Sequence, residues 1–327
     1  MSKEVKYRTA ESVSPGHPDK LCDQISDAVL DAHLAEDSDA RVAIDVAGGH
    51  GKVFVTGEVT SRASNVDIAA IVYRIAGDVE VIVQLAKQSA EIAQGVDTGG
   101  AGDQGIMIGY ACDETPELLP LEVVLSRRLN QFIYAKFPFD GKTQVTLKNN
   151  QIDSIVASFQ NASQKELEKL VKNWLSQKNL INFSSLIKIF ANPAGDWSKG
   201  GFDSDAGLTG RKLAVDNYGP RIAVGGGCFS GKDPSKVDRS AAYMARHIAV
   251  DYLRKRQASE VFVRLAYAIG MAEPLEKSVI IEGRYEIVAD DYDLTPHGII
   301  KTLDLKRPIY EPTARYGHFG EGFDWDK

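Results

Sequence analysis

The chain has 327 residues, a formal net charge of −7, 43% hydrophobic residues and 25% charged residues. This ordinary globular composition excludes a disordered chain, a collagen-like fibre and a disulfide-rich miniprotein. The length predicts two or three domains. The acidic balance argues against a general nucleic-acid binder, although it leaves room for a locally basic pocket that binds a small anion.

Signals for membrane insertion, secretion and transition-metal binding are missing from the sequence. No apolar run is long enough for a membrane helix, and residues 1–6 lack the apolar core of a signal peptide. The three cysteines, Cys22, Cys112 and Cys228, are odd in number and far apart, which argues against a disulfide framework. We therefore expect a reducing, cytoplasmic location. The histidines form no zinc-binding pair, so we expect any metal to be a hard cation held by carboxylates and phosphates.

The first segment, residues 1–95, combines helices and strands. Apolar residues Leu21, Ile25, Val29 and Ala32 predict a helix that begins after Pro18, a residue suited to the first helical turn. The other elements predicted here are strands at 41–46, 52–59 and 80–85 and a helix at about 63–76.

The second segment, residues 96–200, begins with a glycine-rich stretch. Ser163 and Glu166 have the spacing of a capping box, which predicts a helix at 163–177. The remaining predictions are strands at 106–111, 143–147 and 152–159 and a helix at 121–132.

The third segment, residues 201–327, contains further glycine loops. A long helix at 236–256 is predicted to start from Ser235, with Asp238 at the capping-box position. We also expect strands at 212–216, 221–225, 261–269 and 278–288 and a last helix at 296–303. Helices and strands mix without strict alternation, so the sequence predicts an α+β protein of three related domains, with approximate boundaries at residues 95 and 200.

Two glycine motifs resemble nucleotide-binding fingerprints without matching them. Residues 100–105 read GAGDQG, but this motif precedes a predicted strand, whereas a dinucleotide site needs it between a strand and a helix. Residues 226–232 approach a Walker A loop, yet Asp233 follows the lysine where Ser or Thr is needed, and Pro234 interrupts the helix start. Glycine amides and a lysine beside a helix start still favour phosphate.

Charge concentrates around these loops. Residues 205–239 contain six basic and four acidic residues, a local balance of +2 against −9 for the rest of the chain. A solvated surface run remains the alternative. His17 and Asp19 at the first helix start could bind a phosphate and a divalent cation, although a simple turn and cap would also explain them. A turn explains the cluster at Asp140 and Lys142 equally well.

Four sequence blocks together carry a specific resemblance. They are GHPDK at 16–20, GAGDQG at 100–105, GLTGRK at 207–212 and GGGCFSGKDPSKVDR at 225–239. In this order the chain resembles the methionine adenosyltransferase (S-adenosylmethionine synthase) family from about residue 8 to about residue 322. The resemblance implies three interleaved domains in a pseudo-threefold arrangement. It also implies a reaction in which the sulfur of L-methionine displaces triphosphate from C5′ of ATP, after which the triphosphate is hydrolysed to diphosphate and phosphate.

The family resemblance further implies two Mg²⁺, one K⁺ and a homodimer, or a dimer of dimers, with active sites between subunits. The residues that would act on the reacting groups are His17, Lys142, Arg211 and Lys232. Additional ATP contacts would be Asp140, Asp196, Trp197, Asp205, Lys212 and Cys228. Methionine contacts would be Glu58, Gln88, Asp103, Asp205 and Lys236. Metal ligands would be Asp19 and Asp238 for Mg²⁺ and Asp45 for K⁺.

The sequence departs from the family pattern in two respects. Asp45 stands where the family commonly has a glutamate, which leaves K⁺ activation open. The loop after Gln88 and the region 61–85 look shortened, so we expect weaker closure of the loop over the site or an altered dependence on that closure. Two other hypotheses remain: a non-catalytic nucleotide-binding partner of an active chain, and a triphosphate hydrolase that has lost the transferase step.

Overall fold

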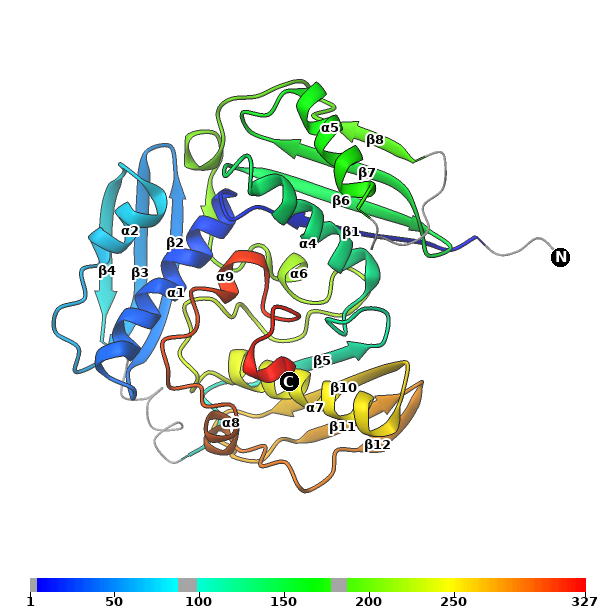
Figure 1. The fold of residues 1–327 in the computed structure, drawn as a ribbon. Coiled ribbons are helices and arrows are strands. Elements are labelled where there is room, and N and C mark those ends of the chain that lie inside the picture. The colour runs from blue at the N-terminus through cyan, green and yellow to red at the C-terminus, as the bar shows by residue number, and fades with distance from the viewer. Residues whose placement is uncertain (1–4, 88–98, 178–186) are drawn as a thin grey trace.

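The computed structural model of the chain describes residues 5–87, 99–177 and 187–327. Within these residues, three four-stranded sheets surround a centre that holds the short helices α6 (Leu213–Asp216) and α9 (Thr313–Tyr316) (Figure 1). The long helices α1, α4 and α7 lie between their sheets and this centre (Figure 1). The prediction of an α+β fold with three helix-and-sheet units is confirmed.

The first sheet has the strand order β4-β3-β2-β9, and helix α1 packs on it. Alternate residues Val42, Ile44 and Val46 of β2 are buried, as expected of a strand with one face in the core. Pro18 begins α1, and the apolar positions Ile25 and Val29 face the same core. The elements are α1 (Pro18–Glu36), β2 (Arg41–Gly49), β3 (Lys52–Thr60), α2 (Ile68–Ala76), β4 (Glu80–Ala86) and β9 (Gly207–Leu208).

The second sheet has the order β1-β6-β7-β8 and a core of its own. The predicted capping box is confirmed, because Ser163 and Glu166 satisfy each other's backbone N–H groups at the start of α5. Leu167, Val171 and Trp174 form the buried stripe of that helix. The elements are β1 (Tyr7–Val13), α4 (Leu121–Tyr134), β6 (Gly141–Lys148), β7 (Gln151–Phe159), α5 (Gln164–Leu175) and β8 (Lys188–Ala191).

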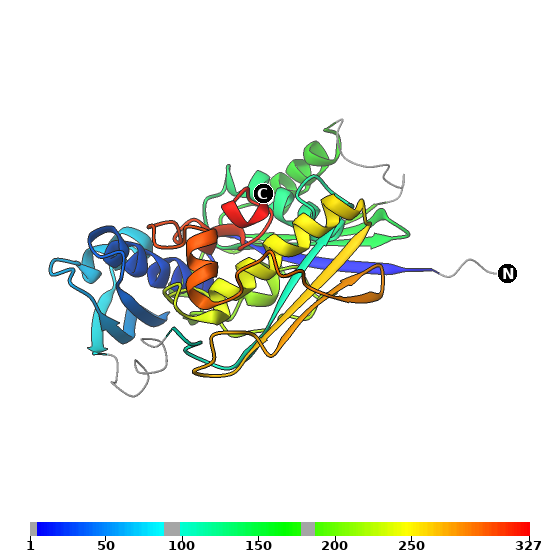
Figure 2. The same cartoon turned by 90° about the horizontal axis from the view of Figure 1, so that it is seen from below.

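The third sheet has the order β12-β11-β10-β5, and α7 covers one of its faces (Figure 2). Small buried residues of α7, among them Ala241, Ala245 and Ala249, allow this helix to lie close to β5 and β10. The elements are β5 (Gly105–Cys112), α7 (Val237–Arg256), β10 (Glu260–Tyr267), β11 (Glu276–Ile281), β12 (Arg284–Ile287) and α8 (Pro296–Thr302). Two single 3₁₀ turns complete the described elements, at Gly201–Asp203 and Asp324–Asp326.

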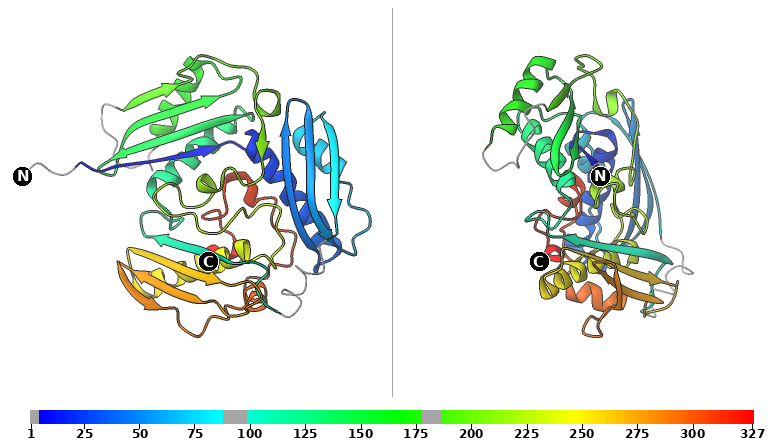
Figure 3. Two further views of the ribbon diagram at one scale, coloured as in Figure 1. Left: turned by 180° about the vertical axis from the view of Figure 1, so that it is seen from behind. Right: turned by 90° about the vertical axis from the view of Figure 1, so that its right-hand side faces the viewer.

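Each sheet takes one strand from another segment of the chain. The first sheet contains β9 from the third segment, the second contains β1 from the first, and the third contains β5 from the second. The view from behind in Figure 3 shows these exchanged strands beside their sheets. The three units are therefore interleaved, and the boundaries at residues 95 and 200 stay predictions.

Several local predictions were wrong. Residues 213–216 form helix α6 instead of a strand, and 221–225 form a loop. A buried side chain accounts for the first error: the guanidinium of Arg127 donates to the carbonyl oxygens of Val215, Asp216 and Asn217, which are therefore occupied and do not pair with a neighbouring strand. The predicted strand at 278–288 is the hairpin of β11 and β12.

The start of α7 also differs from the prediction. The helix begins after Lys236 without a side-chain cap, so the capping box of Ser235 and Asp238 is wrong. The carboxylate of Asp238 is instead bonded to the N–H of Gly227 and to Lys232. Strands β1 and β8 were not predicted, and α2 begins at Ile68, later than expected. Among the described residues, no helix combines the length and apolarity needed to span a bilayer.

Candidate active site

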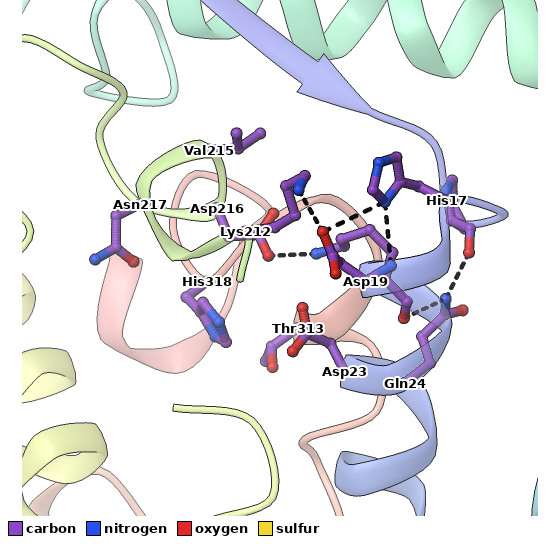
Figure 4. Close-up of polar contacts among 12 residues, drawn as sticks. His17, Asp19, Asp23, Gln24, Lys212, Val215, Asp216, Asn217, Thr313 and His318 are labelled. Carbon is purple, nitrogen blue, oxygen red and sulfur yellow. Dashed lines mark hydrogen bonds and ion pairs between the residues drawn. The ribbon is translucent and has the colours of Figure 1, made fainter. Parts of the chain in front are cut away.

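Charged side chains gather at the first turn of α1 (Figure 4). The fully buried Asp19 accepts the N–H of Leu208 at Oδ1 over 3.0 Å, and Arg211 Nε lies 3.0 Å from the same oxygen. Lys212 Nζ donates to Oδ2 of this carboxylate. His17 caps the helix, because its Nδ1 accepts the Asp19 N–H over 3.1 Å. Asp19 therefore binds two basic residues, Arg211 and Lys212. Both belong to residues 207–212, which we call the first glycine loop.

The environment sets the protonation states of His17 and Asp19. Burial, followed by the charges of Lys212 and Lys142, lowers the pKa of His17 to about 3. At neutral pH the ring is therefore neutral and carries its proton on Nε2, because Nδ1 accepts a hydrogen bond. Burial acts to raise the pKa of Asp19, but Lys212 and the Leu208 N–H outweigh it and lower the pKa below its ordinary value. The site combines a permanent anion with cationic and neutral donors.

The second sheet contributes Asp140 and Lys142 to the same region. A Cβ atom at Gly16 would lie 2.7 Å from the backbone of Phe139, so only glycine permits the α1 lead-in to approach the residues just before β6 this closely. Asp140 Oδ2 accepts the N–H of Gly201 over 3.0 Å. Lys142 is exposed on β6 and acts on the pKa of His17. The three predicted residues therefore lie together, although 125 positions separate His17 from Lys142 in the sequence.

Asp238 anchors a second group of charges at the start of α7. Its Oδ1 accepts the Gly227 N–H over 3.1 Å, and Lys232 Nζ donates to Oδ2 over 2.6 Å. Both partners belong to residues 225–232, the second glycine loop. Cys228 is partly buried in this loop, and burial raises the pKa of its thiol well above the ordinary value. The thiol of this cysteine is therefore kept in its neutral form.

The two glycine loops meet along one edge of β2. Leu208 of the first loop pairs with Ala47, and Lys232 of the second loop pairs with Ala43. Asp45 lies between these two register positions and is exposed. The loops also touch directly, because a side chain at Gly210 would lie only 2.7 Å from Sγ of Cys228. The predicted phosphate-binding residues of both loops therefore border one surface.

The predicted methionine contact Glu58 faces the same side of the first sheet. Ala43 of β2 pairs with Glu58 on one side and with Lys232 on the other, so Glu58 and Lys232 lie on either side of the same residue. An exposed apolar row crosses this outward face next to them. The row consists of Ile82, Phe54, Ala47 and Leu208. Asp103, the other described acidic contact, is exposed just before β5.

The carboxylates fit Mg²⁺ of the kind that is bound jointly with phosphates. Among the residues that the structure describes, there is no group of three or more acidic, histidine or cysteine side chains that could enclose a metal. Asp19 and Asp238 instead offer one carboxylate each, beside lysines that can bind phosphate. Mg²⁺ commonly takes one or two carboxylates and completes its shell with water and phosphate oxygens, which agrees with this arrangement.

Among the other predicted residues, Asp205 is near enough for its charge to act on the pKa of His17, whereas Lys236 and Asp196 have other partners. Lys236 Nζ is bonded to Asp233 over 2.8 Å, and Asp196 accepts the N–H of Gln164 at the start of α5. Trp197 is partly exposed beside Asp196, and Asp205 is exposed. Gln88 lies outside the described residues. A cavity of about 580 Å³ extends beside Asp233 at α8, and the predicted site residues do not line it.

Sequence reasoning missed a row of aspartates along α1. Asp23, Asp27 and Asp31 continue from Asp19 at four-residue intervals, which places all four on one helix face. Each accepts a backbone N–H from a distant loop, at Leu208, Gly210, Gly231 and Tyr310 respectively. Lys20 was also missed, and it forms a buried ion pair with Asp216. The four-residue spacing was the available signal.

Comparisons with known proteins identify the family of the chain. The N-terminal, central and C-terminal domain models of S-adenosylmethionine synthetase match residues 5–97, 98–197 and 199–327. The S-adenosylmethionine synthase of Treponema denticola is 42% identical over 379 aligned positions, which cover 100% of this chain and 97% of the relative. That of Salinibacter ruber is 43% identical over 365 positions, covering 98% and 95%. The chain belongs to the S-adenosylmethionine synthetase family.

Proposed function

We propose that this chain makes S-adenosylmethionine from ATP and L-methionine. The methionine sulfur forms a bond to C5′ of the ribose, the C5′–O bond breaks, and triphosphate leaves with the bonding electron pair. Water then cleaves the triphosphate to diphosphate and phosphate. The observation that carries the proposal is the convergence of Arg211, Lys212 and Lys232 on two buried carboxylates at the starts of α1 and α7.

The triphosphate is the group that these basic residues bind. Arg211, Lys212 and Lys232 turn from their present carboxylate partners to the phosphate oxygens. Together with the exposed Lys142 they stabilise the charge that builds on the leaving group. His17, neutral at physiological pH, donates a hydrogen bond from Nε2 toward the leaving oxygen. Asp19 and Asp238 would hold Mg²⁺, which supplies further neutralisation of phosphate charge.

The same residues serve the hydrolytic step. Triphosphate remains among the basic side chains after the first bond has broken, so it is already positioned for attack by water. The transferase step needs little proton transfer, because a sulfonium forms by direct displacement. Alignment of sulfur, C5′ and leaving oxygen, together with fixed positive charge, therefore accounts for catalysis.

The two organic substrates use the rest of the predicted set. Glu58, Gln88 and Asp103 bind the ammonium end of methionine, and Lys236 leaves Asp233 to bind its carboxylate. The adenosine moiety of ATP is contacted by Asp140, Asp196, Asp205 and Cys228, with the adenine base stacked on Trp197. Asp45 of β2 would supply an oxygen ligand to K⁺.

A second copy of the chain completes the site in this proposal. The predicted methionine contact Glu58 is partly exposed on the first sheet, whose outward face also carries the apolar row around Phe54, and Asp103 is exposed just before β5. Exposed apolar surface of this kind is typical of an interface between copies. We expect a homodimer, alone or paired into a tetramer. Sedimentation of Phe54→Lys should give a monomer with lost activity, while Tyr73→Lys on α2 keeps the wild-type state.

Product analysis tests the function. The protein is incubated with ATP, L-methionine, Mg²⁺ and K⁺, and S-adenosylmethionine, diphosphate and phosphate should appear in equal amounts. Cleavage of added tripolyphosphate without S-adenosylmethionine would favour a hydrolase that has lost the transferase step. Nucleotide binding without any turnover would favour a non-catalytic partner.

A further inference from the structure

We propose that Asp27 and Arg239, which lie outside the predicted site, form a positioning pair that holds Lys232 and Asp238 in their working geometry. The inference rests on the proposed function, because it assigns how that site is kept in place. It is carried by a set of contacts between α1, α7 and the second glycine loop.

Asp27 and Arg239 connect α1 to α7 in the protein interior. Arg239 Nη1 lies 2.6 Å from Oδ1 of Asp27, and Nη2 lies 2.9 Å from Oδ2, so the two planar groups meet through parallel hydrogen bonds. Both side chains are fully buried. Burial alone would lower the pKa of Arg239, but the charge of Asp27 raises it well above the ordinary value, so the guanidinium stays ionised.

The same two side chains hold the second glycine loop. Arg239 Nη1 also donates to the carbonyl oxygens of Phe229 and Lys232, over 2.9 and 3.2 Å. Asp27 Oδ1 accepts the N–H of Gly231 over 2.8 Å. Backbone groups at three of the four residues 229–232 are therefore bonded to one ion pair.

This arrangement points to positioning as the contribution of the pair. Arg239 follows Asp238 directly on α7, and it binds the carbonyl of Lys232, whose Nζ donates to Asp238. A buried ion pair adds little net stability, because the loss of hydration offsets the attraction of the charges. Its bonds to the loop fix where the ammonium and the carboxylate meet, and a displacement of about 1 Å in such groups costs about 100-fold in rate.

Helix α7 carries a second ion pair that serves as a matched control. Arg246 Nε lies 2.9 Å from Oδ1 of Asp326, and both side chains are buried. Asp326 Oδ2 accepts the N–H of Gly320 over 2.8 Å, much as Asp27 accepts that of Gly231. This second pair secures the C-terminal segment and has no contact with the glycine loops among its described hydrogen bonds.

The experiment compares Asp27→Asn with Asp326→Asn in the full chain, at a temperature at which circular dichroism shows both to be folded. The readouts are kcat, KM for each substrate, the Mg²⁺ concentration for half-maximal rate, and calorimetric binding of a Mg²⁺–ATP analogue with an uncleavable leaving group. We expect Asp27→Asn to lower kcat by about 10- to 100-fold and to raise the Mg²⁺ requirement by a similar order, with KM for methionine little changed. Asp326→Asn should lower Tm while leaving kcat and the Mg²⁺ requirement at wild-type values.

Unchanged kcat and Mg²⁺ dependence in folded Asp27→Asn would overturn the positioning role, as would equal losses in both variants. If Asp27→Asn does not fold, Thr313→Val takes its place, because Thr313 Oγ1 accepts from Arg239 Nη2 over 3.1 Å. That variant should lower kcat in the folded protein, and unchanged kcat would contradict the role. If the wild type makes no S-adenosylmethionine, the proposed function fails separately. The positioning role is then decided by calorimetry, in which equal binding of the Mg²⁺–nucleotide to wild type and Asp27→Asn refutes it.

Discussion

Lys232 Nζ donates to Oδ2 of Asp238 over 2.6 Å, so a basic residue of the second glycine loop and the first acidic residue of α7 neutralise each other. In the proposed reaction the two side chains have different roles: Lys232 binds phosphate and the carboxylate of Asp238 would hold Mg²⁺. The pair therefore keeps both charges at the site and gives each a partner until the substrate arrives.

The first prediction concerns Asp238. Asp238→Asn should lower S-adenosylmethionine synthesis by at least about 100-fold, because the amide cannot replace a carboxylate as a Mg²⁺ ligand. Far-ultraviolet circular dichroism should match the wild type. Asp290→Asn, a change of the same kind at an exposed position, serves as the control and should keep full activity. Near-wild-type synthesis by Asp238→Asn would contradict the metal assignment.

The second prediction concerns Lys142 on β6. Lys142→Ala should reduce synthesis by about 100-fold or more through the loss of one phosphate donor. Because this side chain is exposed, the free energy of unfolding should change by less than about 0.5 kcal/mol. Lys148→Ala removes an exposed lysine at the other end of the same strand and should leave turnover intact. If the two variants had equal activity, Lys142 would not belong to the site.

Local patterns predicted most of the helices and strands, and the failures are elements that depend on contacts between residues far apart in the sequence. The helices at Pro18, Ser163 and Lys236 follow from spacing and composition. The strand predicted at 212–216 failed because the buried side chain of Arg127, nearly 90 positions away, binds the carbonyls there. Strand β9 has only two residues and exists because it pairs with β2. Neither contact leaves a mark in the local sequence.

In the candidate site, too, some features follow from the local sequence and others depend on tertiary contacts. The glycine loops, His17 and Asp19 could be selected from residue type and helix position alone. The contact of Gly210 with Cys228, which brings the two loops together, depends on tertiary folding. Roles for Trp197 and Glu58 came only from the family resemblance, because no local pattern distinguishes an aromatic or acidic ligand contact from ordinary surface.

The third prediction is a pH dependence of stability caused by His17. Its pKa is about 3 in the folded protein and 6.5 when unfolded, so between these values the unfolded state binds more protons. The buried neutral His17 therefore lowers the free energy of unfolding as the pH falls below 6.5, by at most about 1.4 kcal/mol per pH unit. Above pH 6.5 His17 does not make the free energy of unfolding depend on pH. Urea unfolding of wild type and His17→Asn between pH 4 and 8 measures it. The stability difference should shift in favour of the variant below pH 6.5, and a constant difference would refute the neutral buried ring.

The fourth prediction concerns Asp45 and potassium. Because Asp45 is exposed between the two glycine loops, K⁺ bound there should raise the rate above that measured in Na⁺. Asp45→Asn should remove this difference by weakening the oxygen ligand, while the rate in Na⁺ stays near that of the wild type. Equal wild-type rates in K⁺ and Na⁺ would show that no functional potassium site exists at Asp45.

The relatives also bear on the shortened regions. All 327 residues of this chain align with the Treponema denticola protein over 379 positions, so 52 or more positions of that relative have no counterpart here. This chain is therefore more compact than that relative, as a chain with shortened regions should be.

The central claim is that bond cleavage occurs between C5′ and oxygen of ATP, and isotope position tests it most directly. ATP carrying ¹⁸O in the bridge between C5′ and the α-phosphorus is turned over with L-methionine, and the products are examined by mass spectrometry. The account predicts that all of the label leaves with the diphosphate and phosphate, in step with S-adenosylmethionine. Label retained on the 5′-oxygen of a nucleoside or nucleotide product would show attack at phosphorus and contradict the account.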